Sequence, residues 1–364
     1  MKAFHILGAA ALLGIGVAVF SADVAAADSI VMSGLNNPRG LTLVRHGDRA
    51  ALYVAEAGTG GTLCGAQLRG TVCVGRTGSV SRYWRGEQER IVEGLPSYAP
   101  FASGASAGAV GPSDVSFAGG RGYVAIGLAS NPDKRAALGE GFGWIARFAP
   151  NGTVSYTLDV SGYEQQANPD HGLVESNPYG LLAGAGEDVV VDAAGNSLLH
   201  VARSGRISTG AVFPSRPQGR GTDAVPTSVA IGPDGAYYVG ELTGVPFAPG
   251  EARVWRVVPG QAPQVYCSGF SFIIDLDFDR HGNLYVLEHA SGLRGPFAGT
   301  PGQLLRVERD CRRTPVRTGL PAPTSVAIGP DGEAYASING TSPAIGAVLR
   351  IDLGRDGRGG EGDE

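Results

Sequence analysis

The sequence predicts an all-β fold, a six-bladed β-propeller with four strands in each blade. One phrase recurs six times along the 364 residues, and two neighbouring copies, beginning at Pro178 and Pro226, are 48 residues apart. Each copy contains a hairpin signature, and the last copy lacks a strand that the N-terminal segment can supply. A period of this length with several short strands is typical of propeller blades.

The first two strands of a blade are predicted by an apolar run, a turn and a second β-rich run. In the fourth copy these are 229–231, Pro233-Asp234-Gly235 and 237–239. Asp-Gly between two such runs is a hairpin signal. A third run has an apolar-x-Arg-apolar pattern in five copies and His200 in place of Arg in another, and a fourth run ends in Gly-Leu or Gly-Phe.

The number of blades follows from the residues that begin the first strands. Prolines occupy this position in five copies and Phe272 lies near it in the fifth copy; the prolines are Pro38, Pro112, Pro178, Pro226 and Pro323. The first two copies are longer because they contain insertions at 57–77 and 128–142. Long insertions on a regular scaffold often carry function.

The N-terminal segment is predicted to close the ring. The sixth copy ends after its third strand, whereas residues 30–35 match the missing fourth strand. Pairing of this strand with the last blade would leave no open sheet edge between the first and last blades.

The domain boundaries follow from composition. Residues 1–27 resemble a cleaved signal peptide, with Lys2, an apolar stretch at 7–19 and small residues at 25–27. We therefore expect a propeller at 28–353, a flexible Gly-rich and acidic tail at 354–364, and a secreted, periplasmic or cell-envelope protein. No second apolar segment follows, so no membrane span is expected in the mature chain.

Export permits disulfides, and the four cysteines are predicted to form Cys64–Cys73 and Cys267–Cys311. The first pair lies within one short loop, and the second occupies outer positions of consecutive copies. No CxxC spacing occurs, which disfavours a zinc site. The net charge of −5 disfavours binding to a polyanion, so no nucleic-acid partner is expected.

Carboxylates are predicted to gather at one mouth of the channel, where the first strand of each blade starts and the second ends. The six are Glu56, Asp114, Asp192, Glu241, Asp275 and Glu288. Crowded carboxylates repel one another, and Ca²⁺ is the cation that oxygen ligands suit best. They are therefore candidate metal ligands; the alternative is that they pair with Arg or cap turns.

The sequence contains no convincing catalytic constellation, and we assign no catalytic residue. His171 and His289 are the candidates for acid–base chemistry, and His289 has the stronger case because it follows Glu288. His200 is expected to be structural.

Several phrases resemble the ScyD/ScyE family, and more broadly propellers of the NHL and gluconolactonase-like groups. They are 37–41, 52–56, 111–115, 177–181 and 238–247, and together the resemblance covers nearly the whole mature chain. The resemblance implies an exported bacterial six-bladed propeller, linked by gene neighbourhood to scytonemin pigment biosynthesis in cyanobacteria. It supplies no catalytic residues.

Two functions fit these observations. The first is a non-catalytic module outside the cytoplasm that binds a small molecule, a glycan or a protein on the face bearing the insertions. The alternative is a Ca²⁺-dependent lactone or ester hydrolase at the channel mouth. The absence of a nucleophile or acid–base set favours the binding module.

Overall fold

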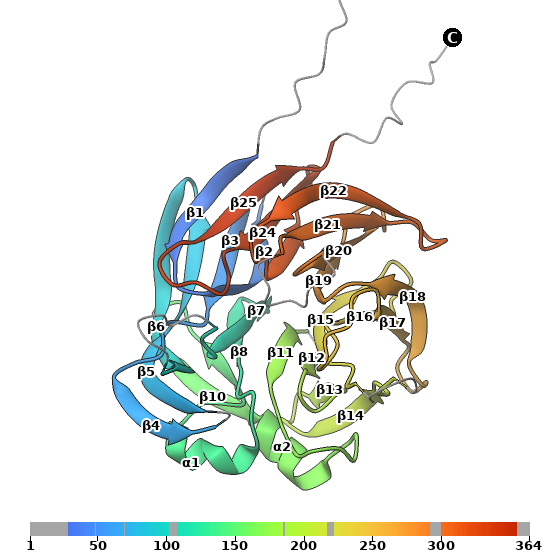
Figure 1. The fold of residues 1–364 in the computed structure, drawn as a ribbon. Coiled ribbons are helices and arrows are strands. Elements are labelled where there is room, and N and C mark those ends of the chain that lie inside the picture. Colours follow the sequence, from blue (N-terminus) through green and yellow to red (C-terminus); the bar gives the residue numbers. More distant parts are fainter. Residues whose placement is uncertain are drawn as a thin grey trace, which may run out of the picture.

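The computed structural model describes residues 28–47, 49–68, 70–101, 108–184, 186–216, 222–291 and 300–354. In this part of the chain six antiparallel sheets are arranged in a ring (Figure 1); five have four strands and one has five. The six-bladed propeller is confirmed. The predicted signal peptide and nearly all of the predicted tail lie outside the described residues. Among those described, no helix is long and apolar enough to cross a membrane.

All helices of the described chain lie in the connections of blade 2, the second of the first three blades. Blade 1 consists of β2 (Pro38–His46), β3 (Arg49–Glu56), β5 (Thr71–Trp84) and β6 (Glu87–Pro100), with β4 (Leu63–Gln67) paired to β5. Blade 2 consists of β7 (Pro112–Ala118), β8 (Arg121–Ile126), β9 (Trp144–Phe148) and β10 (Val154–Asp159), with η1 (Pro132–Lys134), α1 (Arg135–Leu138) and α2 (Val160–Ala167) in its connections. Blade 3 consists of β11 (Pro178–Leu182), β12 (Glu187–Asp192), β13 (Ser197–Ala202) and β14 (Ile207–Val212).

The remaining blades are built from strands alone. Blade 4 consists of β15 (Pro226–Ile231), β16 (Tyr237–Glu241), β17 (Ala252–Val257) and β18 (Gln264–Phe270). Blade 5 consists of β19 (Ile273–Phe278), β20 (Leu284–Glu288), β21 (Gly302–Val307) and β22 (Arg313–Leu320). Blade 6 consists of β23 (Ser325–Ile328), β24 (Glu333–Ile338), β25 (Gly346–Asp352) and the N-terminal β1 (Ser29–Leu35).

The prolines identified in the sequence begin the inner strands of four blades. In blade 1, for example, Pro38 pairs with Glu56 at the end of the second strand. Proline lacks an N–H group, but it is tolerated as the first residue of an edge strand because no hydrogen bond to a neighbouring strand is required there. In blade 5 the equivalent residue is Ile273, which pairs with Glu288, so Phe272 lies one residue before this position.

The predicted closure of the ring is confirmed. Strand β1 pairs antiparallel with β25, with Met32 opposite Val348 and Leu35 opposite Gly346. Met32 and Leu35 are buried, and they pack with residues of blade 1 and blade 6 in one apolar cluster. The first segment of the described chain therefore holds its last blade against its first.

The apolar core is divided among the blade interfaces. Six clusters of buried side chains each join one blade to the next, so the described core forms a ring around the channel. The largest joins blades 1 and 2 and extends into the insertions of both.

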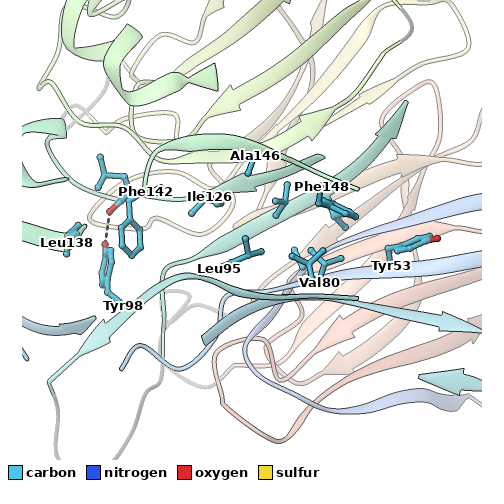
Figure 2. Close-up of a cluster of buried hydrophobic side chains, with 14 of the residues drawn as sticks. Tyr53, Val80, Leu95, Tyr98, Ile126, Leu138, Phe142, Ala146 and Phe148 are labelled. Atoms are coloured by element: carbon cyan, nitrogen blue, oxygen red, sulfur yellow. Dashed lines mark hydrogen bonds between the residues drawn. The ribbon is translucent and has the colours of Figure 1, made fainter. Parts of the chain in front are cut away.

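We call the two ends of the propeller the insertion end and the hairpin end. At the insertion end, second strands lead to third strands and fourth strands lead to the next blade; at the hairpin end, the other strands turn. Both predicted insertions lie at the insertion end. Figure 2 shows Tyr98 of β6 beside Phe142, and its hydroxyl donates to the Leu128 carbonyl at 2.7 Å. Leu138 of α1 packs in the same cluster, so the insertions at 57–77 and 128–142 share one apolar core. We call these two insertions together the extension.

Both predicted disulfides are confirmed. Cys64–Cys73 links β4 to β5 within the extension, and Cys267–Cys311 links β18 of blade 4 to the turn before β22 of blade 5.

The contribution of the closing strand can be measured with two substitutions on β1. Leu35 is 0% exposed, and Leu35→Ala should lower the free energy of unfolding by about 3 kcal/mol because it leaves a cavity between blades 6 and 1. Ile30 on the same strand is 61% exposed, and Ile30→Ala should change it by less than about 0.5 kcal/mol. Urea unfolding provides the measurement, and equal effects would contradict closure by β1.

Candidate functional site

The six predicted carboxylates divide into two sets. Glu56, Asp192, Glu241 and Glu288 end the second strands of four blades, and Asp114 and Asp275 lie on inner strands. The first four were expected at the mouth of the channel, and their exposed fractions are only 0–3%. Each accepts hydrogen bonds from the chain around it, which offset the cost of burying a carboxylate.

Three of the buried carboxylates fasten the segment that enters their own blade. Glu56 accepts from the Asn36 amide at 2.6 Å, and Asp192 accepts from the Asn177 amide at 2.6 Å. Glu288 accepts from the Ser271 amide at 2.7 Å. These amides immediately precede inner strands, so the carboxylates fix where each inner strand begins.

Arginine compensates two of these charges. Arg90 donates to both carboxylate oxygens of Glu56 at 3.0 Å. Glu241 accepts from Arg216 at 2.7 Å and Arg253 at 2.6 Å, and from the Trp255 indole at 2.9 Å. Burial raises the pKa of Glu241, and the bond from Arg253 opposes this shift. Pairing with Arg, which was the alternative interpretation from the sequence, therefore describes the contacts of Glu56 and Glu241.

Asp114 and Asp275 join neighbouring blades at the channel. Asp114 accepts from the amides of Val115 and Leu181, both at 2.8 Å, so it connects blades 2 and 3. Asp275 accepts from the Leu276 amide at 2.8 Å and from the Val326 amide at 2.9 Å, so it connects blades 5 and 6. Burial raises the pKa of Asp114 well above its usual range and that of Asp275 to about 7.

Asp277, two residues after Asp275 on β19, also connects blades 5 and 6. It accepts from the amides of Phe278 and Ile328, both at 2.8 Å, and burial raises its pKa to about 6. Between blades 6 and 1, the Leu41 amide donates to the Ser325 hydroxyl at 2.9 Å. The inner strands are sheet edges whose amides need acceptors, and these side chains supply them.

The channel contains a cavity of about 280 Å³ lined by residues of all six inner strands, including Asp114, Tyr179, Ser228 and Asp275. This is slightly below the usual size of ligand pockets. Burial raises the pKa of Tyr179, and the charge of Arg39 opposes this shift. The cavity is therefore a small polar space between inner strands.

Arg39 is a buried residue between blades that sequence reasoning missed. It is 9% exposed and donates to the carbonyls of Gly340 in blade 6 and Ala109 before blade 2. Burial lowers its pKa. Its position in the repeat, directly after the first-strand proline, was the available signal. Blades 2, 4 and 6 have a small Ser or Thr at this position, and its hydroxyl donates to the next inner strand.

The two histidine candidates lie apart, His289 after β20 of blade 5 and His171 in the loop before blade 3. His289 is buried, and its Nδ1 lies 2.7 Å from the Pro323 carbonyl oxygen, so Nδ1 carries the hydrogen. Burial lowers its pKa. His171 is exposed, and His200 lies 2.9 Å from Glu187 at the opposite end of blade 3.

No group of three or more His, Cys, Asp or Glu side chains converges as a metal site within the described ranges. The assignment of the six carboxylates as metal ligands remains a prediction.

A second cavity, of about 1250 Å³, lies at the hairpin end between blades 5 and 6 and is lined by Arg280, Asp331, Glu333 and Arg350 among others.

No protein-family model and no curated protein matches the chain. Solved structures share its fold. A putative oxidoreductase (glucose dehydrogenase) from Thermus thermophilus has 19% identity and a TM-score of 0.54, over 89% of this chain and 99% of that one. A putative gluconolactonase has 10% identity and a TM-score of 0.51, over 89% and 91%. A luciferin-regenerating enzyme has 11% identity and a TM-score of 0.51, over 89% and 94%. These similarities support the six-bladed propeller fold alone.

The structural role of the buried carboxylates can be tested at Glu241. Glu241→Gln leaves Arg216 and Arg253 facing a neutral amide and should lower the free energy of unfolding by about 3 kcal/mol, because it breaks a buried ion pair. Glu251 bonds to the same Arg216, but its side chain is 57% exposed, so Glu251→Gln should cost less than about 1 kcal/mol. A Glu241→Gln variant as stable as wild type in urea would contradict this role.

Proposed function

We propose that the protein is an exported, non-catalytic binding module of the ScyD/ScyE type that holds a partner protein at its insertion end. The observation that carries the proposal is the placement of exposed apolar side chains. Eight large apolar residues are exposed in the described chain, and five belong to insertion-end connections or to strands extended there: Leu63, Phe101, Leu173, Val245 and Ile345, each 61–78% exposed.

The spread of these side chains favours a protein over a small molecule. They come from blades 1, 4 and 6 and from the connection into blade 3. A ligand that contacts several of them must span much of this end, as a protein surface does.

The insertion end also offers a rigid platform. The extension of blades 1 and 2 has its own apolar core and the Cys64–Cys73 disulfide. Binding through a preformed surface loses less conformational entropy than binding through unstructured loops.

Export is supported by two disulfides and by the signal-like sequence of residues 1–27. The non-catalytic role is supported by the engagement of the channel carboxylates in bonds between blades. Hydrolysis of lactones or esters remains the alternative, and turnover by the purified protein would contradict the proposed role.

Site-specific photocrosslinking tests the binding face. A benzophenone side chain is introduced separately at Leu63, Leu173 and Val245, and the exported protein is irradiated in its native cells. We expect all three variants to give the same crosslinked partner, identified by mass spectrometry, because these positions share one end.

Two control positions are also exposed but lie elsewhere. Ile231 ends the inner strand β15 at the hairpin end and is 57% exposed, and Val265 on the outer strand β18 is 48% exposed. Neither should give the partner. The same product from all five positions, or no product from the insertion end, would contradict the assigned face.

A further inference from the structure

The two disulfides of the described chain differ in their surroundings. Cys267 is 2% exposed and lies in the apolar cluster between blades 4 and 5, and the half-buried Cys311 packs against the same cluster. Cys64, by contrast, is exposed and Cys73 is half-buried, and both belong to the extension at the insertion end. A reductant therefore has direct access to Cys64, whereas the packing of two blades shields Cys267.

Strand β4 is attached to its sheet along one side only. It pairs with β5 through four residue pairs, one of which is Cys64 with Cys73, and the register shifts between Cys64 and Ala66. Among the described strands it pairs with no other. The same part of β5 also pairs with β6, where Cys73 lies opposite Ala99. Strand β5 is therefore held in the sheet independently of β4.

Side-chain packing adds little to the attachment of β4. Leu63 is 75% exposed, and Cys64 and Gln67 are exposed as well. Ala66, which is partly buried, is the β4 side chain that packs against the apolar cluster between blades 1 and 2. A short strand pairing with so little apolar contact is marginally stable in water. The position of β4 therefore depends on the covalent bond between Cys64 and Cys73.

We propose that Cys64–Cys73 is a redox switch, and that its reduction by a dithiol releases β4 from β5 and removes Leu63 from the binding face. Exposed disulfides are the ones that tend to be labile and regulatory. Leu63 immediately precedes Cys64, so it moves with the strand. The effect on a partner rests on the proposed function, whereas the release of β4 does not.

The reduction is a two-step thiol–disulfide exchange. A thiolate of the dithiol attacks Sγ of the exposed Cys64, which breaks the Sγ–Sγ bond, forms a mixed disulfide and releases Cys73 as a thiolate. The second thiol of the reductant, as its thiolate, then attacks the mixed disulfide and releases Cys64. The dithiol is oxidised to a disulfide, and the cysteines take up its two electrons and two protons.

Limited reduction of the purified protein tests the lability of this disulfide. Dithiothreitol is added under native conditions, free thiols are trapped with iodoacetamide, and the alkylated peptides are quantified by mass spectrometry. Cys64 and Cys73 should be alkylated about tenfold faster than Cys267 and Cys311, because the reductant reaches an exposed disulfide more readily. Equal rates for the two pairs, or faster reduction of Cys267–Cys311, would overturn the proposal.

Hydrogen exchange measures whether β4 is released. A chain with both Cys64→Ser and Cys73→Ser represents the reduced state, and its peptide covering Leu63–Gln67 should exchange about tenfold faster than in oxidised wild type. A peptide covering β17 of blade 4 should exchange at the same rate in both chains. If the double variant does not fold, wild type reduced and alkylated at Cys64 and Cys73 provides the comparison. An unchanged rate at β4 would contradict the release.

Photocrosslinking separates the switch from the proposed function. In the chain with Cys64→Ser and Cys73→Ser, a benzophenone at Leu63 should lose its crosslinked partner, whereas one at Val245 in blade 4 should keep it. Equal yields at Leu63 with and without the substitutions, or equal loss at both positions, would contradict a local switch. If wild type gives no product at either position, the proposed function fails, and the alkylation and exchange rates still decide whether reduction releases β4.

Discussion

The propeller depends on how the inner strands satisfy their amides. Each inner strand is the edge of its sheet, so alternate N–H groups point away from the ladder and need other acceptors. Asp114, Asp275 and Asp277 each accept from two amides, one in their own blade and one in the next. A single side chain thereby completes two strand edges and fixes two blades relative to each other.

This constraint explains the acidic residues along the channel. A carboxylate has two oxygens that can accept from two strands, which a hydroxyl achieves less completely. The buried acids at the ends of the second strands hold the segments that enter the blades, as Glu56 does with Asn36. Both sets serve the scaffold, which moves the search for function toward the insertion end. There, the extension and the exposed apolar residues come from chain outside the regular repeat.

The sequence predicted the features that follow from periodicity. The repeat placed the inner strands, and the missing strand in the sixth copy predicted the pairing of β1 with β25. Cysteine positions predicted both disulfides. Burial and partners were not predictable in the same way, because register gives a residue's position but not its neighbours in the next blade. Arg216 beside Glu241 illustrates this, since they are 25 residues apart and meet only in the folded ring.

The central claim is that channel aspartates hold the edge amides of neighbouring blades, and native-state hydrogen exchange tests it most directly. In wild type, the amides of Leu181 and Val326 should both exchange slowly. Asp114→Ala should accelerate exchange at Leu181 at least tenfold more than at Val326, and Asp275→Ala should do the reverse. This reciprocal pattern separates a local effect from general destabilisation. Unchanged rates, or equal acceleration of both amides in each variant, would contradict the account.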